Sequence, residues 1–451
     1  MVSPERLKEL HENRDAIARV NAKREKANAW TILKHSIGSD LTRLTIPIVF
    51  NEPLSFLQRL TEYMEYSTLL SSIAAEEDPV KRIEKVAAFA VSALSSNHGR
   101  LRKPFNPILG ETYQLDKPEF RVCCEQVSHH PPISAFHAQG TGFKFYGSIN
   151  PRIKIRGQSL EIEPIGLFTL ELESVGDVYT WSNVNTLVNN IIVGALTIEQ
   201  ARPLSIIFAS YQIVPYKEGN MEITSHRSGL KCVLQFKPTT TLFGSSERRS
   251  IQGYITNQQK HRIRAVYGDW TQFLASCNVE SFKRSFPRWT KERSGTPLSR
   301  TASSPDQSSS VIRLVSDCDF AHPAVTGIAN STLLWQVEAK PPFAPEFFGF
   351  NHFAMELNCL KPAASTSLPP TDSRLRPDIR LLEKGNLEAA EKEKLRLEEK
   401  QRLAFEARKK SKQPWMPRWF FLGTHSETNK PCWLFSGTYW QRDWSNCPDL
   451  F

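Results

Sequence analysis

The stretch Glu125-Gln-Val-Ser-His-His-Pro-Pro-Ile-Ser-Ala135 places two adjacent histidines directly before two prolines. Proline fixes its own φ angle and has no backbone N–H, so the chain at His129 and His130 can be neither helix nor paired strand. The residues on either side, from Phe120 to Val127 and from Ile133 to Phe136, have the apolar and polar alternation of strands. The sequence therefore predicts a rigid turn that holds both imidazoles at the rim of a sheet, where ligands commonly bind.

Paired histidines on a stiff turn fit several kinds of site. A metal site needs further ligands, and the nearby Cys123, Cys124 and His137 do not have the spacing of a zinc site. A nucleophilic site needs a strained elbow, and Ser128 lacks the glycines of that motif, so we expect no catalytic residue here. The residues alone leave two interpretations equal. One is an anion site, because imidazoles offer polarised N–H groups, and the other is a structural turn whose histidines bond nearby carbonyls.

A second candidate cluster lies in the charged segment from Asp372 to Lys412, which we expect to be helical. Lys394, Glu398 and Arg402 recur every four residues. Each step of four turns a helix by about 400°, so the three side chains line one stripe, and Glu398 in the middle can hold both cations. From the spacing alone, a salt-bridged surface helix is favoured over a binding site.

Two motifs resemble those of the oxysterol-binding-protein-related family of lipid transfer proteins. The string from Glu125 to Pro132 (EQVSHHPP) resembles the family fingerprint, and Lys103-Pro-Phe-Asn-Pro-Ile-Leu-Gly-Glu111 resembles its second signature at the expected distance upstream. The similarity runs from about Trp30 to the C-terminus. It is closest to the short members that consist mainly of the lipid-binding domain, as in Asn51-Glu-Pro-Leu-Ser-Phe-Leu-Gln-Arg59 and Leu375-Arg-Pro-Asp-Ile-Arg380.

The resemblance implies a phosphoinositide headgroup site drawn from distant segments. The stretch from Lys394 to Arg402 matches the family's Lys-xxx-Glu-Glu-x-Gln-Arg string, which implies that this helix forms one wall of the site. A phosphorylated inositol carries several negative charges, so it needs cations from several directions. The predicted set is Lys103, Asn106, His129, His130, Lys394, Glu398 and Arg402, with the histidines as the expected specificity element.

The resemblance also implies a second ligand, a sterol such as cholesterol or an oxysterol, in a hydrophobic tunnel. The position that matches the family's hydroxyl-facing glutamine is Asn97, which is one methylene shorter. The segment 22–37, with Trp30 and Leu33 at helical spacing, resembles the lid over the tunnel, although an ordinary helix docked on the core has the same pattern. One tunnel cannot hold both lipids. The implied function is therefore exchange of a sterol for phosphatidylinositol 4-phosphate or a bisphosphate between membranes, without enzyme activity.

A series of short alternating runs predicts the fold class. Many short strands with polar turns indicate an antiparallel barrel or sandwich. The resemblance implies an α+β, mostly β fold: a large incomplete antiparallel β-barrel around the tunnel, with an N-terminal lid and helices and a C-terminal helical subdomain. The predicted strands are Lys144–Ile149, Ile153–Arg156, Leu160–Ile162, Phe168–Leu172, Tyr179–Trp181, Glu222–Thr224, Lys231–Phe236, Ile251–Ile255 and Ile263–Tyr267.

Changes in composition divide the chain into segments. We expect a solvated, partly frayed helix at Ser3–Val20, an insertion without family counterpart at Ala201–Lys217, and further strands at Thr332–Val337 and His352–Leu357. The tryptophans of the tail, 414–451, should pack as a satellite core. The predicted segments are an N-terminal helical extension (1–21), the lid (22–37), a helical region (38–100), the barrel core (101–292), a disordered Ser/Pro-rich loop (293–311), barrel strands (312–362) and a C-terminal helical subdomain (363–451).

The charge of the chain predicts the class of partner. The 451 residues carry a formal net charge of +10, which favours an anionic partner. The sequence contains no recognised nucleic-acid-binding module, so we expect anionic membrane surfaces and no nucleic acid. We also expect no cofactor and no metal.

The sequence further predicts a cytosolic protein that acts peripherally at membranes. The longest apolar runs, Val86–Leu94 and Ile191–Ile198, are too short for a membrane span, and the charged N-terminus has no secretory apolar region. Contacts of the endoplasmic reticulum with the plasma membrane or endosomes are the expected location, and contact-site proteins of the endoplasmic reticulum are the expected protein partners. A lipid-gated sensor or scaffold at such contacts, without net transfer, is the alternative function.

Overall fold

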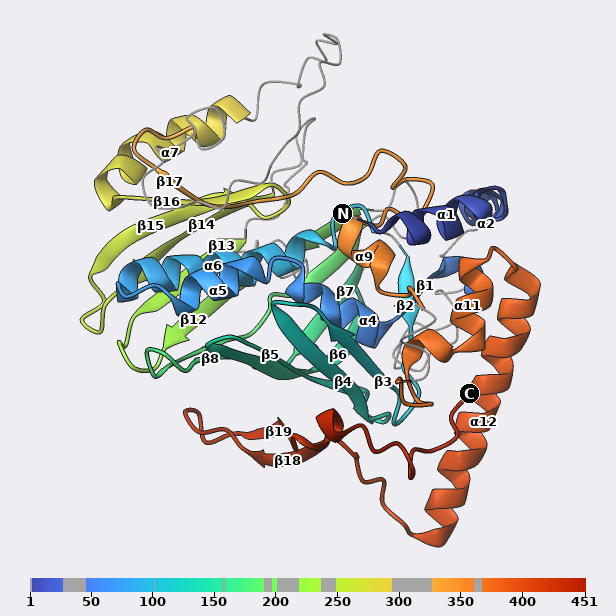
Figure 1. The fold of residues 1–451 in the computed structure, drawn as a ribbon. Helices are drawn as coiled ribbons and strands as arrows, with labels where there is room; N and C mark the ends of the chain where they lie inside the picture. Colours follow the sequence, from blue (N-terminus) through green and yellow to red (C-terminus); the bar gives the residue numbers. More distant parts are fainter. Residues whose placement is uncertain are drawn as a thin grey trace, which may run out of the picture.

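In the computed structural model, a large antiparallel sheet is covered on one face by the buried helix α6 (Figure 1). Among the residues that the structure describes, no helix is long and apolar enough to cross a bilayer. The structure describes residues 2–26, 46–100, 102–156, 159–189, 197–200, 219–236, 249–293, 327–360 and 367–451.

The helices lie mainly at the two ends of the chain and before the sheet. The α-helices are α1 (Pro4–Glu12), α2 (Arg14–Lys26), α4 (Phe56–Thr61), α5 (Thr68–Ala74), α6 (Pro79–Ser95), α7 (Val279–Arg293), α9 (His352–Glu356), α11 (Pro377–Glu383) and α12 (Leu387–Ser411). Short 3-10 turns are η3 (Ile48–Phe50), η4 (Glu62–Met64), η5 (Ser373–Leu375) and η6 (Thr438–Gln441).

The strands fill the middle of the chain. They are β1 (Asn51–Ser55), β2 (Lys103–Phe105), β3 (Thr112–Asp116), β4 (Phe120–Ser128), β5 (Ile133–Gly140), β6 (Phe143–Arg156), β7 (Ser159–Ile165), β8 (Phe168–Leu172), β9 (Asp177–Trp181), β10 (Thr186–Asn189), β11 (Thr197–Gln200), β12 (Gly219–Ser225), β13 (Lys231–Phe236), β14 (Ser250–Thr256), β15 (Arg262–Asp269), β16 (Phe273–Cys277), β17 (Thr332–Gln336), β18 (Phe420–Thr424) and β19 (Pro431–Phe435). Every predicted run from Lys144 to Tyr267 falls within one of these strands.

The strands from β3 to β17 form one antiparallel sheet of fifteen within the described ranges. The long strand β6 pairs with β5 and β8 through its first half and with β7 through its second half, where the branch to β10 and β11 begins. In the described ranges, β3 and β17 do not pair with each other, so the sheet stays open. The predicted mostly-β fold with an incomplete antiparallel barrel is confirmed.

From Val86 to Leu94, helix α6 is apolar on all sides apart from Ser92, as expected for a helix enclosed by protein. Phe89 at its middle meets Phe145 of β6 edge to face, with ring centroids 5.1 Å apart, and Phe145 stacks on Trp181 of β9 at 5.6 Å. Aromatic pairs of this geometry add to the gain from burial. This core fixes the sheet against the helices and leaves the rim around β2, β4 and α12 for the site.

The N-terminal helices are not the solvated, partly frayed helix that we expected at Ser3–Val20. Ile17 and Val20 are fully buried, and Arg6 is buried with its Nε donating to the carbonyl of Met355 at 2.8 Å. Arg6 also pairs with Glu383 of α11. Charged residues made the helix look solvent-exposed in the sequence, but the carboxylate of the distant Glu383 allows it to dock.

Two further expectations about segments are wrong. The run His352–Leu357 forms α9 rather than a strand, because the side chain of Asn351 accepts a hydrogen bond from the Ala354 amide at 2.7 Å and caps a helix. In the predicted helical subdomain 363–451, the last α-helix ends at Ser411, and the tail forms the β18–β19 hairpin followed by the short η6. The satellite core of the tail is confirmed: Trp419, Phe420 and Tyr439 are buried together against β4 and β5.

Several expectations fall outside the described residues. These are the lid residues Trp30 and Leu33, the insertion at Ala201–Lys217, and nearly all of the loop 293–311.

Candidate functional site

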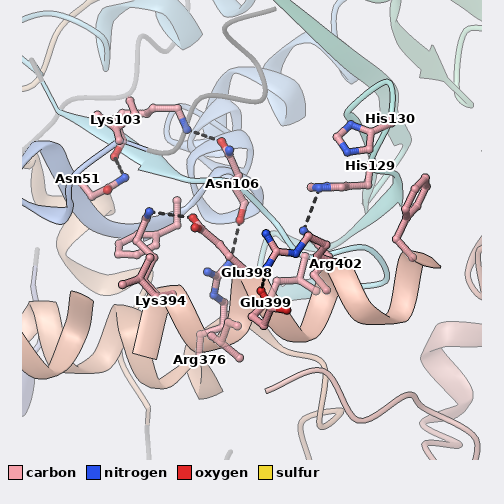
Figure 2. A pocket seen from close by; sticks show the side chains of 17 residues that line it. Asn51, Lys103, Asn106, His129, His130, Arg376, Lys394, Glu398, Glu399 and Arg402 are labelled. Atoms are coloured by element: carbon pink, nitrogen blue, oxygen red, sulfur yellow. Dashed lines mark hydrogen bonds and ion pairs between the residues drawn. The ribbon is translucent and has the colours of Figure 1, made fainter. Parts of the chain in front are cut away.

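One pocket of about 580 Å³ brings all seven predicted headgroup residues together. Its walls are the loop after β2, the histidine turn after β4, and one face of α12 (Figure 2). The site residues come from four separate parts of the sequence: Asn51, Lys103 and Asn106, His129 and His130, and the residues from Arg376 to Phe405.

Strand β2 and the loop that follows it present Lys103 and Asn106. The Lys103 ammonium donates to the side-chain oxygen of Asn106, and the Asn106 carbonyl accepts from Arg376 at 3.0 Å. Glu111 at the end of this loop is fully buried and does not face the pocket; its carboxylate accepts from the Ile108 amide at 2.9 Å and from Arg376 at 2.7 Å. Glu111 at the end of the signature therefore fixes the conformation of the loop, whereas Lys103 and Asn106 at its start face the pocket.

The histidine turn is held in place by its flanking residues. Glu125 accepts hydrogen bonds from the amides of Arg418 and Trp419, each at 2.9 Å, which ties the strand to the tail. Burial raises the pKa of Glu125 to about 7. His129 lies 2.9 Å from the side-chain nitrogen of Gln401 on α12, and the His130 ring meets Phe405 edge to face at 5.9 Å. Both imidazoles lie in the pocket, as predicted.

Helix α12 supplies the facing wall. Asn386 caps its first turn by accepting from the Ala389 amide. The Lys394 ammonium lies 2.8 Å from a Glu398 carboxylate oxygen, as the four-residue spacing predicted. Arg402 pairs with Glu399, a partner that the sequence analysis did not assign.

The cations of the pocket affect one another. The Lys103 side chain is half-buried, and burial together with the nearby Lys394 and Arg376 lowers its pKa to about 8, with Glu398 acting in the opposite direction. Arg376 itself is buried, and it keeps its charge because Glu111 and Asp378 each pair with it at 2.7 Å. The pocket thus holds several positive charges in a confined volume, and an anionic ligand would relieve their repulsion.

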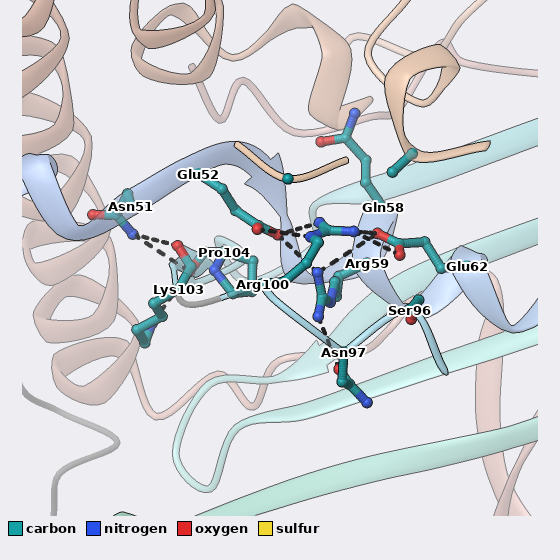
Figure 3. Close-up of polar contacts among 12 residues, drawn as sticks. Asn51, Glu52, Gln58, Arg59, Glu62, Ser96, Asn97, Arg100, Lys103 and Pro104 are labelled. Atoms are coloured by element: carbon teal, nitrogen blue, oxygen red, sulfur yellow. Dashed lines mark hydrogen bonds and ion pairs between the residues drawn. The ribbon is translucent and has the colours of Figure 1, made fainter. Parts of the chain in front are cut away.

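The predicted sterol residue lies in a different environment. The side-chain oxygen of Asn97 accepts a hydrogen bond from Arg59 at 2.8 Å (Figure 3). Arg100 beside it is buried and pairs with Glu52 at 2.7 Å and Glu62 at 2.8 Å. Asn97 therefore borders a buried ion cluster, and its amide nitrogen is turned away from that cluster in Figure 3. Its role toward a sterol stays a prediction.

Comparison with known families decides the identity of the chain. Residues 28–444 match the model of a family described as oxysterol-binding protein. The chain belongs to the oxysterol-binding protein family. The resemblance drawn from the two sequence motifs is confirmed.

Curated members of the family cover most of the chain. Oxysterol-binding protein-related protein 2 of Homo sapiens is 42% identical over 432 residues, which are 95% of this chain and 85% of that protein. Oxysterol-binding protein-related protein 1 of Rattus norvegicus is also 42% identical over 435 residues, but the chain spans only 43% of its length.

Solved structures in the oxysterol-binding protein family share the fold. The Osh1 ORD domain, solved in complex with cholesterol, superposes with a TM-score of 0.74 at 29% identity and covers 94% of this chain and 91% of the Osh1 chain. The Osh3 ORD of Saccharomyces cerevisiae, solved in complex with PI(4)P, gives a TM-score of 0.69 at 27% identity and covers 94% and 96%.

The sequence analysis missed several pocket residues, among them Asn51, Arg376 and Gln401. Asn51 is only 2% exposed; its amide donates to the Lys103 carbonyl at 3.0 Å, and its side-chain oxygen has no hydrogen-bond partner in the described part of the chain. Gln401 accepts from the Leu109 amide at 2.8 Å and so links α12 to the loop. Asn51, Arg376 and Gln401 each lie within a string that resembles the family, and this was the available signal.

Proposed function

We propose that this chain is a lipid carrier that binds the phosphorylated inositol of a phosphoinositide in the pocket. A sterol occupies the chain in its place, and the two lipids are exchanged between membranes. The observation that carries the proposal is the convergence of Lys103, the histidine pair, Lys394 and Arg402 on one confined volume. These residues are far apart in the sequence, and a phosphorylated ring needs cations from several sides.

The pocket chemistry suits such a ring. Lys103 and Lys394 offer point contacts to phosphate oxygens, whereas the planar guanidinium of Arg402 suits a bidentate contact. The ring hydroxyls need acceptors as well, and Asn51 and Glu398, which both have side-chain oxygens, line the pocket. The acyl chains would then leave the pocket toward the apolar interior.

We infer a sterol as the second ligand by analogy with other members of the family. Cholesterol is bound in the Osh1 ORD structure, and PI(4)P is bound in the Osh3 ORD structure. We extend both ligand classes to this chain and infer that they exclude each other, because the acyl chains and the sterol would compete for one apolar interior. A carrier with two exclusive ligands acts in the cytosol, at the surfaces of the membranes that it serves.

The test replaces the histidines that face the ligand. His129→Ala with His130→Ala should abolish extraction of phosphatidylinositol 4-phosphate from liposomes and leave cholesterol extraction intact. His261→Ala, at an exposed turn outside the pocket, is the control and should behave as the parent protein. Unchanged phosphoinositide extraction by the double variant would refute the headgroup site.

A transfer assay distinguishes a carrier from a lipid-gated sensor. Donor liposomes with labelled cholesterol are mixed with acceptor liposomes that contain phosphatidylinositol 4-phosphate. A carrier moves many sterol molecules per protein, and the rate rises when the counter-lipid is present in the acceptor. A single stoichiometric extraction without turnover would favour the sensor.

A further inference from the structure

The C-terminal half of α12 contacts the body of the protein along one side, through Gln401 and Phe405, and is otherwise exposed. The buried residues of this helix are Ala390, Lys394 and Leu397, and every residue from Glu398 onward is at least partly exposed. In Figure 1 this half projects along the edge of the molecule, past the sheet. A free helix end of this kind gains no stability from packing on its outer face, so its side chains are open to a partner.

A few large apolar side chains are exposed on and next to this half. Leu403 is 62% exposed and Phe405 is 41% exposed, and Leu395, one turn before the midpoint, is 55% exposed. Met416, just after the helix, is 75% exposed. At 100° per residue, Phe405, Leu395 and Leu403 fall within about half of the helix circumference, so they belong to one broad face.

Cations predominate along the segment that carries Leu403, Phe405 and Met416. Between Arg402 and Lys412 the chain carries five cations, Arg402, Arg408, Lys409, Lys410 and Lys412, and one carboxylate, Glu406. A helix of cations with interspersed large apolar side chains complements an anionic lipid surface, where the cations meet headgroups and the apolar side chains enter the acyl boundary. A nucleic acid would use the cations and leave Leu403 and Met416 in water.

The same surface borders the headgroup pocket. Leu395, Arg402 and Phe405 line the pocket, and all three are also exposed at the surface. Phe405 contacts the His130 ring, so the docking face and the histidine turn meet at this residue. A headgroup that enters here could pass from the bilayer to the pocket cations without first crossing bulk water.

We propose that residues 402–416, with Leu395, form a docking surface for an anionic bilayer and hold the pocket mouth against the lipid headgroups. This proposal rests on the proposed function, because it assigns the membrane contact of that same pocket. It commits to a lipid bilayer as the occupant.

The experiment measures sedimentation with vesicles of phosphatidylcholine alone and of phosphatidylcholine mixed with phosphatidylserine. In the charge variant, Lys409→Glu is combined with Lys410→Glu; the matched control combines Lys81→Glu with Lys117→Glu, which makes the same change in net charge at exposed positions elsewhere. We expect the charge variant to bind the anionic vesicles at least about tenfold more weakly and the control to bind as the parent protein.

An apolar variant tests the other half of the argument. Leu403→Ser combined with Met416→Ser removes the exposed apolar area without changing any charge. It should weaken binding to anionic vesicles even in salt high enough to screen the cations. Equal binding of the parent protein to neutral and anionic vesicles would overturn the proposal, as would a charge variant that binds like the parent.

A water-soluble inositol phosphate separates this proposal from the proposed function. It reaches the pocket without a membrane, so the charge and apolar variants should bind it like the parent protein. A variant that loses vesicle binding and inositol phosphate binding together would place the effect in the pocket and overturn the docking surface. In another outcome, the parent protein does not bind inositol phosphate, but its vesicle binding is weakened by the charge and apolar variants. That outcome would support the docking surface and refute the headgroup site.

Discussion

Lys103 should make headgroup binding depend on pH above neutrality. Burial, with Lys394 and Arg376 nearby, lowers the pKa of Lys103 in the empty pocket to about 8. A bound phosphate favours the charged ammonium and raises this pKa again, so the ligand binds the protonated form of the protein more tightly. Below a pH of about 8 the ammonium is already charged and the affinity is flat; above it, binding must take up a proton and the affinity falls.

The magnitude follows from the charged fraction of Lys103. About nine tenths of the side chain is charged one unit below its pKa and about one tenth one unit above it. Between about pH 7 and about pH 9 the affinity should therefore fall roughly tenfold, which corresponds to about 1.4 kcal/mol. A phosphate monoester is already fully ionised over this range, because its second pKa is about 6.

Calorimetry with a water-soluble inositol phosphate measures this dependence. Repeating the titration in buffers of different ionisation enthalpy counts the protons taken up, and the count should approach one at about pH 9. Lys103→Arg is the matched control, because a guanidinium stays charged throughout and should flatten the alkaline limb. The same slope in Lys103→Arg and in the parent protein, or a flat profile in the parent, would refute this reasoning.

Three predictions concern stability and are measured by urea denaturation. Burial and two neighbouring carboxylates raise the pKa of Glu65 to about 8, so the folded chain keeps a proton there that the unfolded chain has lost at neutral pH. The free energy of unfolding therefore falls as pH rises toward 8. Glu65→Gln should add on the order of 2 kcal/mol of stability at about pH 7.5 and nothing at about pH 4. An equal gain in stability at both pH values would contradict a raised pKa of Glu65. Arg100→Ala leaves the two buried carboxylates of Glu52 and Glu62 with Arg59 as their remaining ion-pair partner among the described residues, at 3.4 and 3.9 Å. It should cost about 3–5 kcal/mol of stability, whereas a cost below about 1 kcal/mol would mean that Arg59 or water compensates them. Gly110 has φ +86°, and a Cβ there would lie 2.7 Å from the Trp415 ring, so Gly110→Ala should cost roughly 1–3 kcal/mol of stability. Gly142 has a similar φ of +78°, but a Cβ there would meet only the Ala74 Cβ, at 3.4 Å, so Gly142→Ala should cost less.

The sheet was predictable because its signal is local. Phe168–Leu172 and Lys231–Phe236 were predicted with the bounds that the structure has, since alternation of apolar and polar residues reports directly on a strand with one buried face. The headgroup residues were found by another route. From spacing alone, Lys394, Glu398 and Arg402 looked like a surface helix, and only the resemblance of the strings assigned them to a site.

The remaining features depend on contacts between distant residues. The burial of Arg6 requires Glu383 from the other end of the chain, and no pattern near Arg6 announces that partner. Asn51 reaches the pocket because β1 pairs with β2, which sets it opposite Lys103 in the register. His352–Leu357 is a short apolar run that fits either period, and a single capping residue, Asn351, decides for the helix.

The pairing of the pocket cations suits a carrier, which must release its ligand as well as bind it. In the empty pocket, Lys103 donates a hydrogen bond to Asn106, and Lys394 and Arg402 form ion pairs with Glu398 and Glu399. These cations therefore keep a polar partner after a phosphate leaves. Each internal partner also lowers the net gain from a phosphate contact, because that contact replaces a bond already present. A site built for permanent retention would lack these partners. In this pocket the internal partners reduce the free-energy difference between the empty and the loaded state. A competing lipid can therefore shift the equilibrium toward release of the phosphoinositide.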